Sequence, residues 1–168
     1  MTTLLDEMDE ELREAAVRGN VEFLKKCVEL NKPNEYYLTV FPERYDADIW
    51  DGNVFHIAAQ AEQEEFVREV IERKLLPIEV VHQLLCQPRC ETEKDNPLHV
   101  AARSSSSSLS LPSDLPKPWL HINEQGATPC HSALYRDKEE CALEILKMDK
   151  ELLSNMLDNH GDSLLALL

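Results

Sequence analysis

The sequence predicts an all-α protein built from stacked helix–turn–helix repeats, and three short segments that resemble one another carry this prediction. These segments are residues 53–59 (NVFHIAA), 96–102 (NPLHVAA) and 128–134 (TPCHSAL). Each opens with a residue suited to helix capping, and a His and small residues follow at the same offsets. The His-to-His spacings are 43 and 32 residues, and a period near 33 is typical of repeat arrays. Such an array is built to present a surface.

The first repeat is expected over residues 10–50, although it lacks both the capping residue and the His. Residues 12–20 (LREAAVRGN) contain the paired Ala and a following Gly, which marks a turn between two helices. Apolar residues then recur with helical spacing from Val21 to Val28. We therefore expect a helix pair near residues 10–30.

The second repeat is expected over residues 51–94, with a helix pair near residues 53–74. After the motif, apolar residues recur on one face of a helix. An insertion follows over residues 75–94. It contains a short amphipathic pattern that begins after Pro77 and ends at Pro88, which predicts an additional short helix.

The remaining repeats are less regular. The third, at residues 95–122, is degenerate because its second helix is replaced by a loop at residues 104–118 that is rich in Ser and Pro. The fourth, at residues 123–157, is expected to form a helix pair near residues 128–148. A fifth restarts the pattern at residues 158–168 and is truncated there.

Length and charge narrow the function classes. The 168 residues suffice for one domain with a real core, spanning residues 1–168. Asp and Glu number 32 against 17 Lys and Arg, giving a net charge of −15, which argues against nucleic acid as a partner because phosphate binding needs a basic face. The acidic excess fits either a basic partner surface or solvated helix faces that keep an array soluble.

Location is inferred from what the sequence lacks. It contains no run of about 18 apolar residues, so no membrane span is expected, and its acidic N-terminus is unlike a signal or transit peptide. Five Cys is an odd number, and Cys27, Cys130 and Cys141 fall on predicted apolar positions. We interpret them as small buried hydrophobic residues in a reducing, cytoplasmic compartment.

The repeated segments resemble ankyrin repeats, whose motif is T-P-L-H-x-A, so the expected fold is an ankyrin-repeat solenoid of about four to five repeats. Residues 12–30, 52–60, 65–70 and 123–134 further resemble plant ankyrin proteins of the accelerated-cell-death type. That resemblance implies cytosolic ankyrin repeats followed by transmembrane helices, at the cytosolic face of the plasma membrane. It also implies a role in defence and cell-death signalling, without enzymatic activity in the repeats. This sequence lacks the transmembrane part and is expected to be a fragment or a short form.

Histidines and cysteines are the candidates for chemistry. We expect the repeated histidines to bond to the backbone and cap of their own motif, which gives a structural set of Asn53, His56, Asn96, His99, Thr128 and His131. His82, Cys86 and Cys90 have helical spacing that suits a zinc site, but Pro88 breaks that helix and C-x₂-C spacing is absent. No local signature supports a Cys–His nucleophile. We therefore expect no cofactor, metal or enzymatic activity.

The leading functional hypothesis is a protein-interaction module that binds through the turns preceding each cap. The expected contact residues are Trp50, Asp51, Glu93, Lys94, Asp95, Glu124 and Gln125. Trp50 is either a binding anchor or a plug against the inserted helix. The partner is expected to be a protein with a basic surface. The alternative is a fragment that associates with longer ankyrin relatives, or that has no stable partner.

Overall fold

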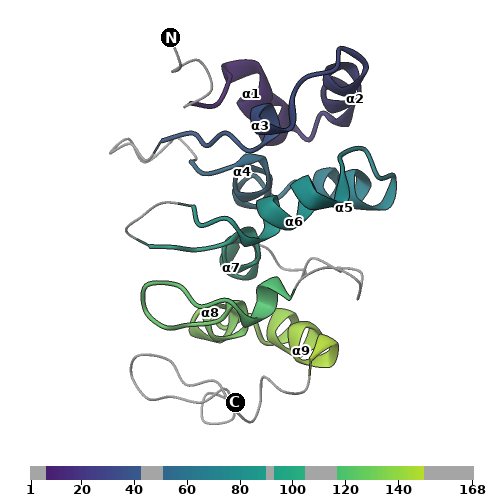
Figure 1. Cartoon of the computed structure of the whole chain (residues 1–168). Helices are drawn as coiled ribbons and strands as arrows, with labels where there is room; N and C mark the ends of the chain where they lie inside the picture. Colours follow the sequence, from purple (N-terminus) through teal and green to yellow (C-terminus); the bar gives the residue numbers. More distant parts are fainter. Residues whose placement is uncertain (1–6, 43–50, 90–92, 105–116, 150–168) are drawn as a thin grey trace.

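Helices make up the regular structure of residues 7–42, 51–89, 93–104 and 117–149, the parts of the chain that the computed structural model describes (Figure 1). These residues form nine α-helices, one 3-10 helix and no β-strand, with one isolated bridge between Phe41 and Gly52. The predicted all-α class is confirmed. The helices are α1 (Glu10–Arg18), α2 (Val21–Glu29), α3 (Asn34–Tyr37), α4 (Val54–Gln60), α5 (Glu64–Glu72), α6 (Ile78–Cys86), α7 (Pro97–Ser104), η1 (Pro118–Leu120), α8 (Pro129–Tyr135) and α9 (Glu139–Met148).

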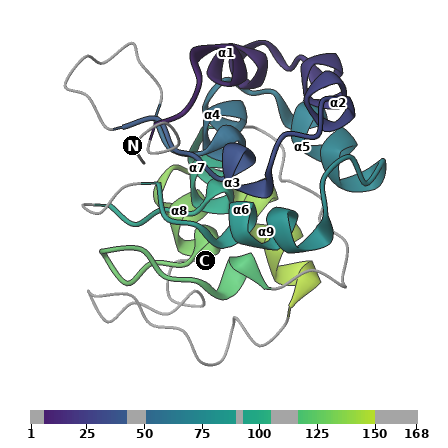
Figure 2. The same cartoon turned by 45° about the horizontal axis from the view of Figure 1, so that its top comes forward.

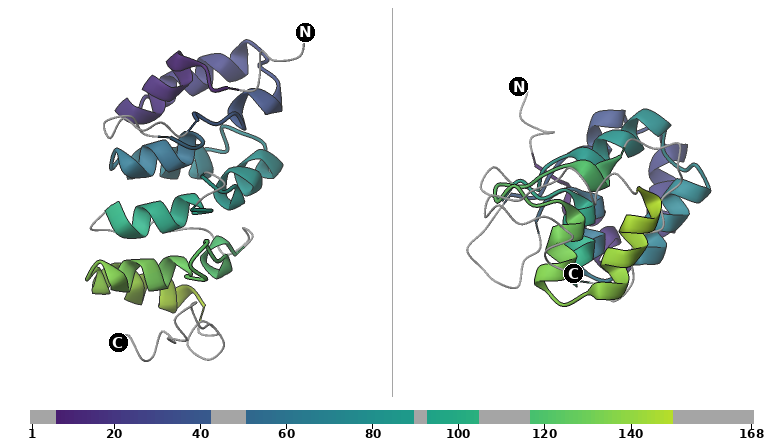
Figure 3. Two further views of the ribbon diagram at one scale, coloured as in Figure 1. Left: turned by 90° about the vertical axis from the view of Figure 1, so that its left-hand side faces the viewer. Right: turned by 90° about the horizontal axis from the view of Figure 1, so that it is seen from below.

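Four helices form an inner row. In Figure 1, α1, α4, α7 and α8 follow one another from top to bottom, and each packs against the next. Helices α2, α5 and α9 form an outer row, and each packs against the inner helix that precedes it in the chain (Figure 3). This arrangement confirms the helix pairs predicted near residues 10–30, 53–74 and 128–148.

Small and apolar residues at equivalent positions allow the inner helices to pack closely. Leu12, Phe55, Leu98 and Cys130 occupy one such position in the four inner helices, and all four side chains are fully buried. The paired alanines that follow are buried as well. Because Ala has no side chain beyond Cβ, neighbouring helices can approach each other without leaving a void. The core is therefore continuous along the stack.

The turn between an inner and an outer helix has the same backbone geometry in three units. Gly19, Glu62 and Asp137 occupy equivalent positions, and their φ angles are +70°, +58° and +58°. In each turn the next N–H group bonds to the carbonyl five residues earlier, at 2.8 Å, which is the Schellman pattern of helix C-termini. Only the first unit places Gly at this left-handed position, where other residues are strained.

The first unit has a helix cap after all, which corrects one expectation. Asp9 stands immediately before α1, and its side chain accepts from the Glu11 N–H group at 3.4 Å. The other carboxylate oxygen accepts a hydrogen bond from the Tyr36 hydroxyl at 3.1 Å. The cap was missed because it lies one position earlier, relative to the Ala pair, than the caps of the other units.

The irregular region of the sequence has two described parts. Helix α6 lies between Pro77 and Pro88 as predicted, and it packs against α4 and α7. The described residues contain no outer helix after α7, and η1 packs against α7 and α8 instead. Trp119 of η1 is buried, and its indole N–H group donates to Asp149 at 3.2 Å. Most of the predicted Ser/Pro loop and the predicted fifth repeat lie outside the described residues.

Candidate binding surface

The predicted structural motif forms a reciprocal cap at the start of α4, α7 and α8. In α4, the Asn53 side-chain oxygen accepts from the N–H groups of Phe55 and His56, at 2.9 and 3.1 Å. In return, His56 Nδ1 accepts from the Asn53 N–H group at 3.1 Å. This is a capping box in which His takes the place usually held by Glu or Gln.

The same arrangement recurs in the next two inner helices. His99 Nδ1 accepts from the Asn96 N–H group at 3.1 Å, and His131 Nδ1 accepts from the Thr128 N–H group at 3.2 Å. In each case the capping side chain also accepts from the backbone N–H of the histidine. All six residues are buried, so the structure places them where a structural motif requires them.

The chain reaches each of these helices through a non-helical segment, which we call a finger. The fingers comprise residues 51–53, 93–96 and 121–128, and they lie along one edge of the stack (Figure 2). Histidines connect each unit to the next finger: His56 Nε2 donates to the Asp95 carbonyl at 2.9 Å, and His99 Nε2 donates to the Ala127 carbonyl at 2.8 Å. Asp95 and Ala127 both lie directly before a cap. The fingers are therefore bonded to the stack at equivalent points.

Burial keeps both of these imidazoles neutral. Loss of hydration lowers the pKa of His56 to about 3 and the pKa of His99 to about 4. With Nδ1 accepting and Nε2 donating, each ring uses its one donor and its one acceptor within the protein. These rings therefore offer no free lone pair to a metal ion and no proton to a substrate.

Four of the seven predicted contact residues are exposed on adjacent fingers: Glu93, Lys94, Glu124 and Gln125. We call these four residues the tip surface. The two fingers are joined through their backbones, because the Glu124 N–H group donates to the Glu93 carbonyl at 2.9 Å. An ion pair between Lys94 Nζ and Glu124 Oε2, at 3.4 Å, joins them through their side chains. Trp50 lies outside the described residues.

The expectation that Asp51 and Asp95 project from the turns is wrong. Asp51 is 6 % exposed and its carboxylate forms an ion pair with Arg89 at 3.2 Å. Asp95 is fully buried, with one carboxylate oxygen paired with Arg103 and the other accepting from Asn123 at 3.0 Å. A buried carboxylate needs such partners to offset its lost hydration. These two aspartates are therefore buried and hold the fingers in place.

Two arginines that the sequence analysis did not single out complete this network. Arg89 follows α6 and pairs with both Asp51 and Glu93, while its backbone N–H donates to the Asp95 carbonyl at 2.6 Å. Arg103 lies near the end of α7. The sequence gives one indication of this network, because Arg103 stands eight residues after Asp95 and directly after the repeated segment. Arg89 lies in the insertion, where the repeat gives no reference position.

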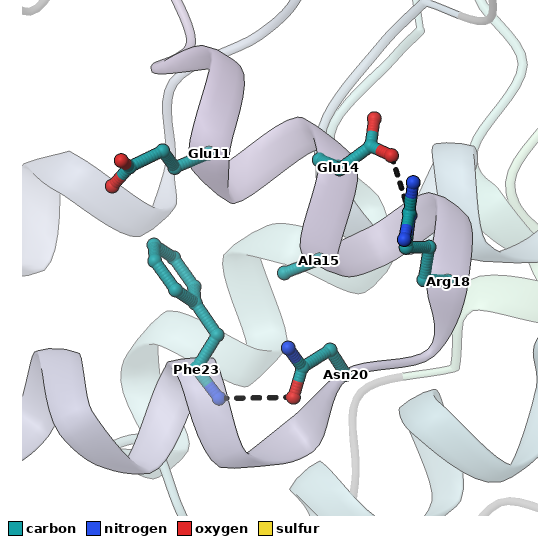
Figure 4. Close-up of a pocket in the computed structure, with 6 residues that line it drawn as sticks. All are labelled: Glu11, Glu14, Ala15, Arg18, Asn20 and Phe23. Carbon is teal, nitrogen blue, oxygen red and sulfur yellow. Dashed lines mark hydrogen bonds and ion pairs between the residues drawn. The ribbon is translucent and has the colours of Figure 1, made fainter.

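A shallow hollow lies between α1 and α2 (Figure 4). Glu14 and Arg18 form an ion pair at 2.5 Å there, and the Asn20 side chain accepts from the Phe23 N–H group at 3.3 Å. Both contacts link residues within one or two turns of the chain. The ion pair lies within α1, and the Asn20 side chain caps α2.

Cysteines at the predicted core positions are buried. Cys27, Cys130 and Cys141 are at most 3 % exposed, and the described cysteines form no disulfide. Burial raises the pKa of Cys130 to about 12 and that of Cys141 to about 11, so both thiols stay protonated at neutral pH. His82 and Cys86 of the zinc alternative lie on α6, whereas Cys90 is outside the described residues. No cluster of three metal-binding side chains occurs in the described part of the chain.

The sequence matches no protein-family model and no curated protein. Across the described ranges, none of the helices combines the length and the apolar character needed to cross a bilayer.

Proposed function

We propose that this chain is an ankyrin-repeat protein that binds another protein through its tip surface and catalyses no reaction. Three regularities support this assignment. The reciprocal caps, the left-handed turns and the histidine-to-finger bonds each recur at equivalent positions in successive units. Stacked repeats of this kind bind partners over extended surfaces that several units share.

The observation that carries the proposal is the contrast between the fixed backbone and the exposed side chains of the fingers. Asp51 and Asp95 are buried in ion pairs, whereas Glu93, Lys94 and Glu124 are exposed a few residues away. A surface whose backbone is already ordered loses little conformational entropy on binding. The fingers therefore present their exposed side chains in a preorganised arrangement.

The chemistry of the tip surface favours a basic protein partner. The tip surface carries two carboxylates, Glu93 and Glu124, and one amine, Lys94. The whole chain carries a net charge of −15. Binding to a basic surface should weaken as salt increases, since screening acts on solvent-exposed charges. Following the resemblance to plant ankyrin proteins, we place this binding in defence or cell-death signalling in the cytoplasm. Longer, membrane-anchored ankyrin relatives are among the candidate partners.

The proposal can be tested by affinity capture from plant cytosol and membranes with two matched variants. The tip variant combines Glu93→Gln with Glu124→Lys. The control combines Glu72→Gln with Glu29→Lys, which makes the same change in net charge at exposed positions on the outer helices. We expect the tip variant to lose partners that the unmodified chain captures at low salt, and the control to retain them.

The structure guides the choice of these substitutions. Glu93 is replaced by Gln because a positive charge beside Arg89 would disturb the buried pair with Asp51. Glu124 can be reversed, because it is exposed and its ion pair with Lys94 lies on the surface. Identical partner lists for the unmodified chain and the tip variant would exclude the tip surface as the binding site.

A further inference from the structure

Two histidines connect successive units through both of their ring nitrogens. His56 accepts from the backbone of its own cap through Nδ1 and donates through Nε2 to the finger of the next unit, at Asp95. His99 does the same with its own cap and with Ala127 of the following finger. Both rings are 0 % exposed. Each imidazole therefore lies at an interface between units and bonds to both sides of it.

Protonation is incompatible with this geometry. A neutral imidazole has one donor and one acceptor, whereas the protonated ring has two donors and no acceptor. A proton on Nδ1 would face the cap's backbone N–H group, which already points at that nitrogen. The bond from the cap's backbone N–H group would be lost, and a charge would be buried. At His99 the Asn96 side-chain oxygen, 2.8 Å from Nδ1, can accept the new proton, but it does not restore that bond.

We propose that the imidazoles of His56 and His99 form an acid-sensitive latch, which holds each following finger on the stack at neutral pH and releases it when the rings are protonated. The latch follows from the bonds between units and needs no partner. Its consequence for binding rests on the proposed function, because the fingers that it holds carry the tip surface. The chain would then present that surface at neutral pH and withdraw it on acidification.

The charges around the rings do not remove the penalty for protonation. Asp95, Arg89 and His99 act on the His56 ring, and Asp95, Arg103 and His121 act on the His99 ring. Asp95 favours the protonated rings, but the arginines oppose it and its own carboxylate is paired with Arg103. Burial outweighs these effects, so the pKa values of both rings lie below the ordinary 6.5.

The direction of the pH effect follows from these pKa values. The unfolded chain binds a proton at each histidine near pH 6.5, whereas the folded chain does so only near pH 3 to 4. The contribution of these two rings to the free energy of unfolding is therefore fully present above about pH 6.5 and decreases as the pH falls below it. At about pH 5, unfolding should take up about one proton per latch histidine.

The test is urea unfolding of the full chain between about pH 7.5 and pH 5, which yields proton uptake from the pH dependence of stability. We expect His56→Gln and His99→Gln each to reduce the uptake at pH 5 by about one proton, because Gln keeps a donor and an acceptor but does not titrate. Gln83→Ala is the control, because this side chain is exposed on α6 and does not titrate, so the uptake should not change.

NMR titration of the histidine rings in the unmodified chain tests the latch even if a variant fails to fold. We expect the ring resonances of His56 and His99 to report neutral imidazoles in the folded chain, down to the pH at which the chain opens. As the pH falls, hydrogen exchange should show that backbone amides in the fingers lose protection at a higher pH than those of α5. Titration of either ring near pH 6.5 in the folded chain would overturn the latch. That result would leave the proposed function intact, because partner capture at neutral pH is measured separately.

Discussion

Asn53 is predicted to contribute more to stability than an ordinary helix cap. Besides capping α4, its side-chain nitrogen donates to the Leu84 carbonyl and to the Gln87 side chain, both at 2.9 Å. Gln87 in turn donates to the Leu38 carbonyl at 3.2 Å. The residue is fully buried, and its bond to the Leu84 carbonyl is buried as well, whereas the bond to Gln87 is half-buried. Asn53 therefore connects α4, α6 and the segment after α3.

The magnitude can be worked out bond by bond. Loss of an N-cap costs about 1 kcal/mol, and each neutral hydrogen bond contributes about 1 kcal/mol. Asn53→Ala removes the cap and two further bonds, so we expect a loss of about 3 kcal/mol. Asn53→Ser retains a capping oxygen and removes only the two bridging bonds, so we expect a loss of about 2 kcal/mol.

Urea denaturation followed by far-ultraviolet circular dichroism measures both losses. The midpoints should fall while the dependence on urea stays the same, because the surface exposed on unfolding is unchanged. Thermal unfolding should show a decrease of about 6–12 °C for Asn53→Ala. Serine keeps the capping oxygen but lacks the side-chain nitrogen that forms the two bridging bonds. If the free energy of unfolding of the serine variant lay within about 0.5 kcal/mol of that of the unmodified chain, the bridging role would be refuted.

Three further variants test other contacts of the fold. Thr128→Ala removes only a cap and should cost about 0.5–2 kcal/mol by urea denaturation, less than Asn53→Ala. Gly19→Ala should cost about 1–2 kcal/mol, because φ is +70° and the new Cβ would lie 2.6 Å from the Gln63 side-chain oxygen; a neutral effect would contradict this turn geometry. Trp119→Phe keeps the apolar ring but loses the bond to Asp149, so a decrease of about 1 kcal/mol is expected, whereas unchanged stability would show that this bond contributes nothing.

The parts of the fold that follow from local chemistry could be predicted from the sequence. Capping residues, prolines and helical spacing of apolar residues act within a few positions, so they indicated the pairs containing α4 and α8 and the inserted helix α6. The burial of Cys130 followed from its place in the repeat, where Leu98 stands one unit earlier. The role of His131 as a partner of its own cap followed in the same way.

The rest depends on contacts between distant residues. Asp51 and Asp95 look like solvated turn residues in the sequence, because charged side chains are usually exposed. They are buried because Arg89 and Arg103, which lie 38 and 8 positions further along, are brought beside them by the stack. The cross-unit bonds of His56 likewise require the next finger to be in place. No local pattern contains this information.

Site-specific photocrosslinking tests the central claim most directly, namely that the fingers form the binding surface. A benzophenone amino acid would be placed at Gln125 on a finger and, in a second protein, at Glu72 on the outer helix α5, both of which are exposed. After irradiation in plant cytosol, we predict a discrete adduct from position 125 that disappears with added salt, and none from position 72. An adduct from position 72 alone would contradict the account.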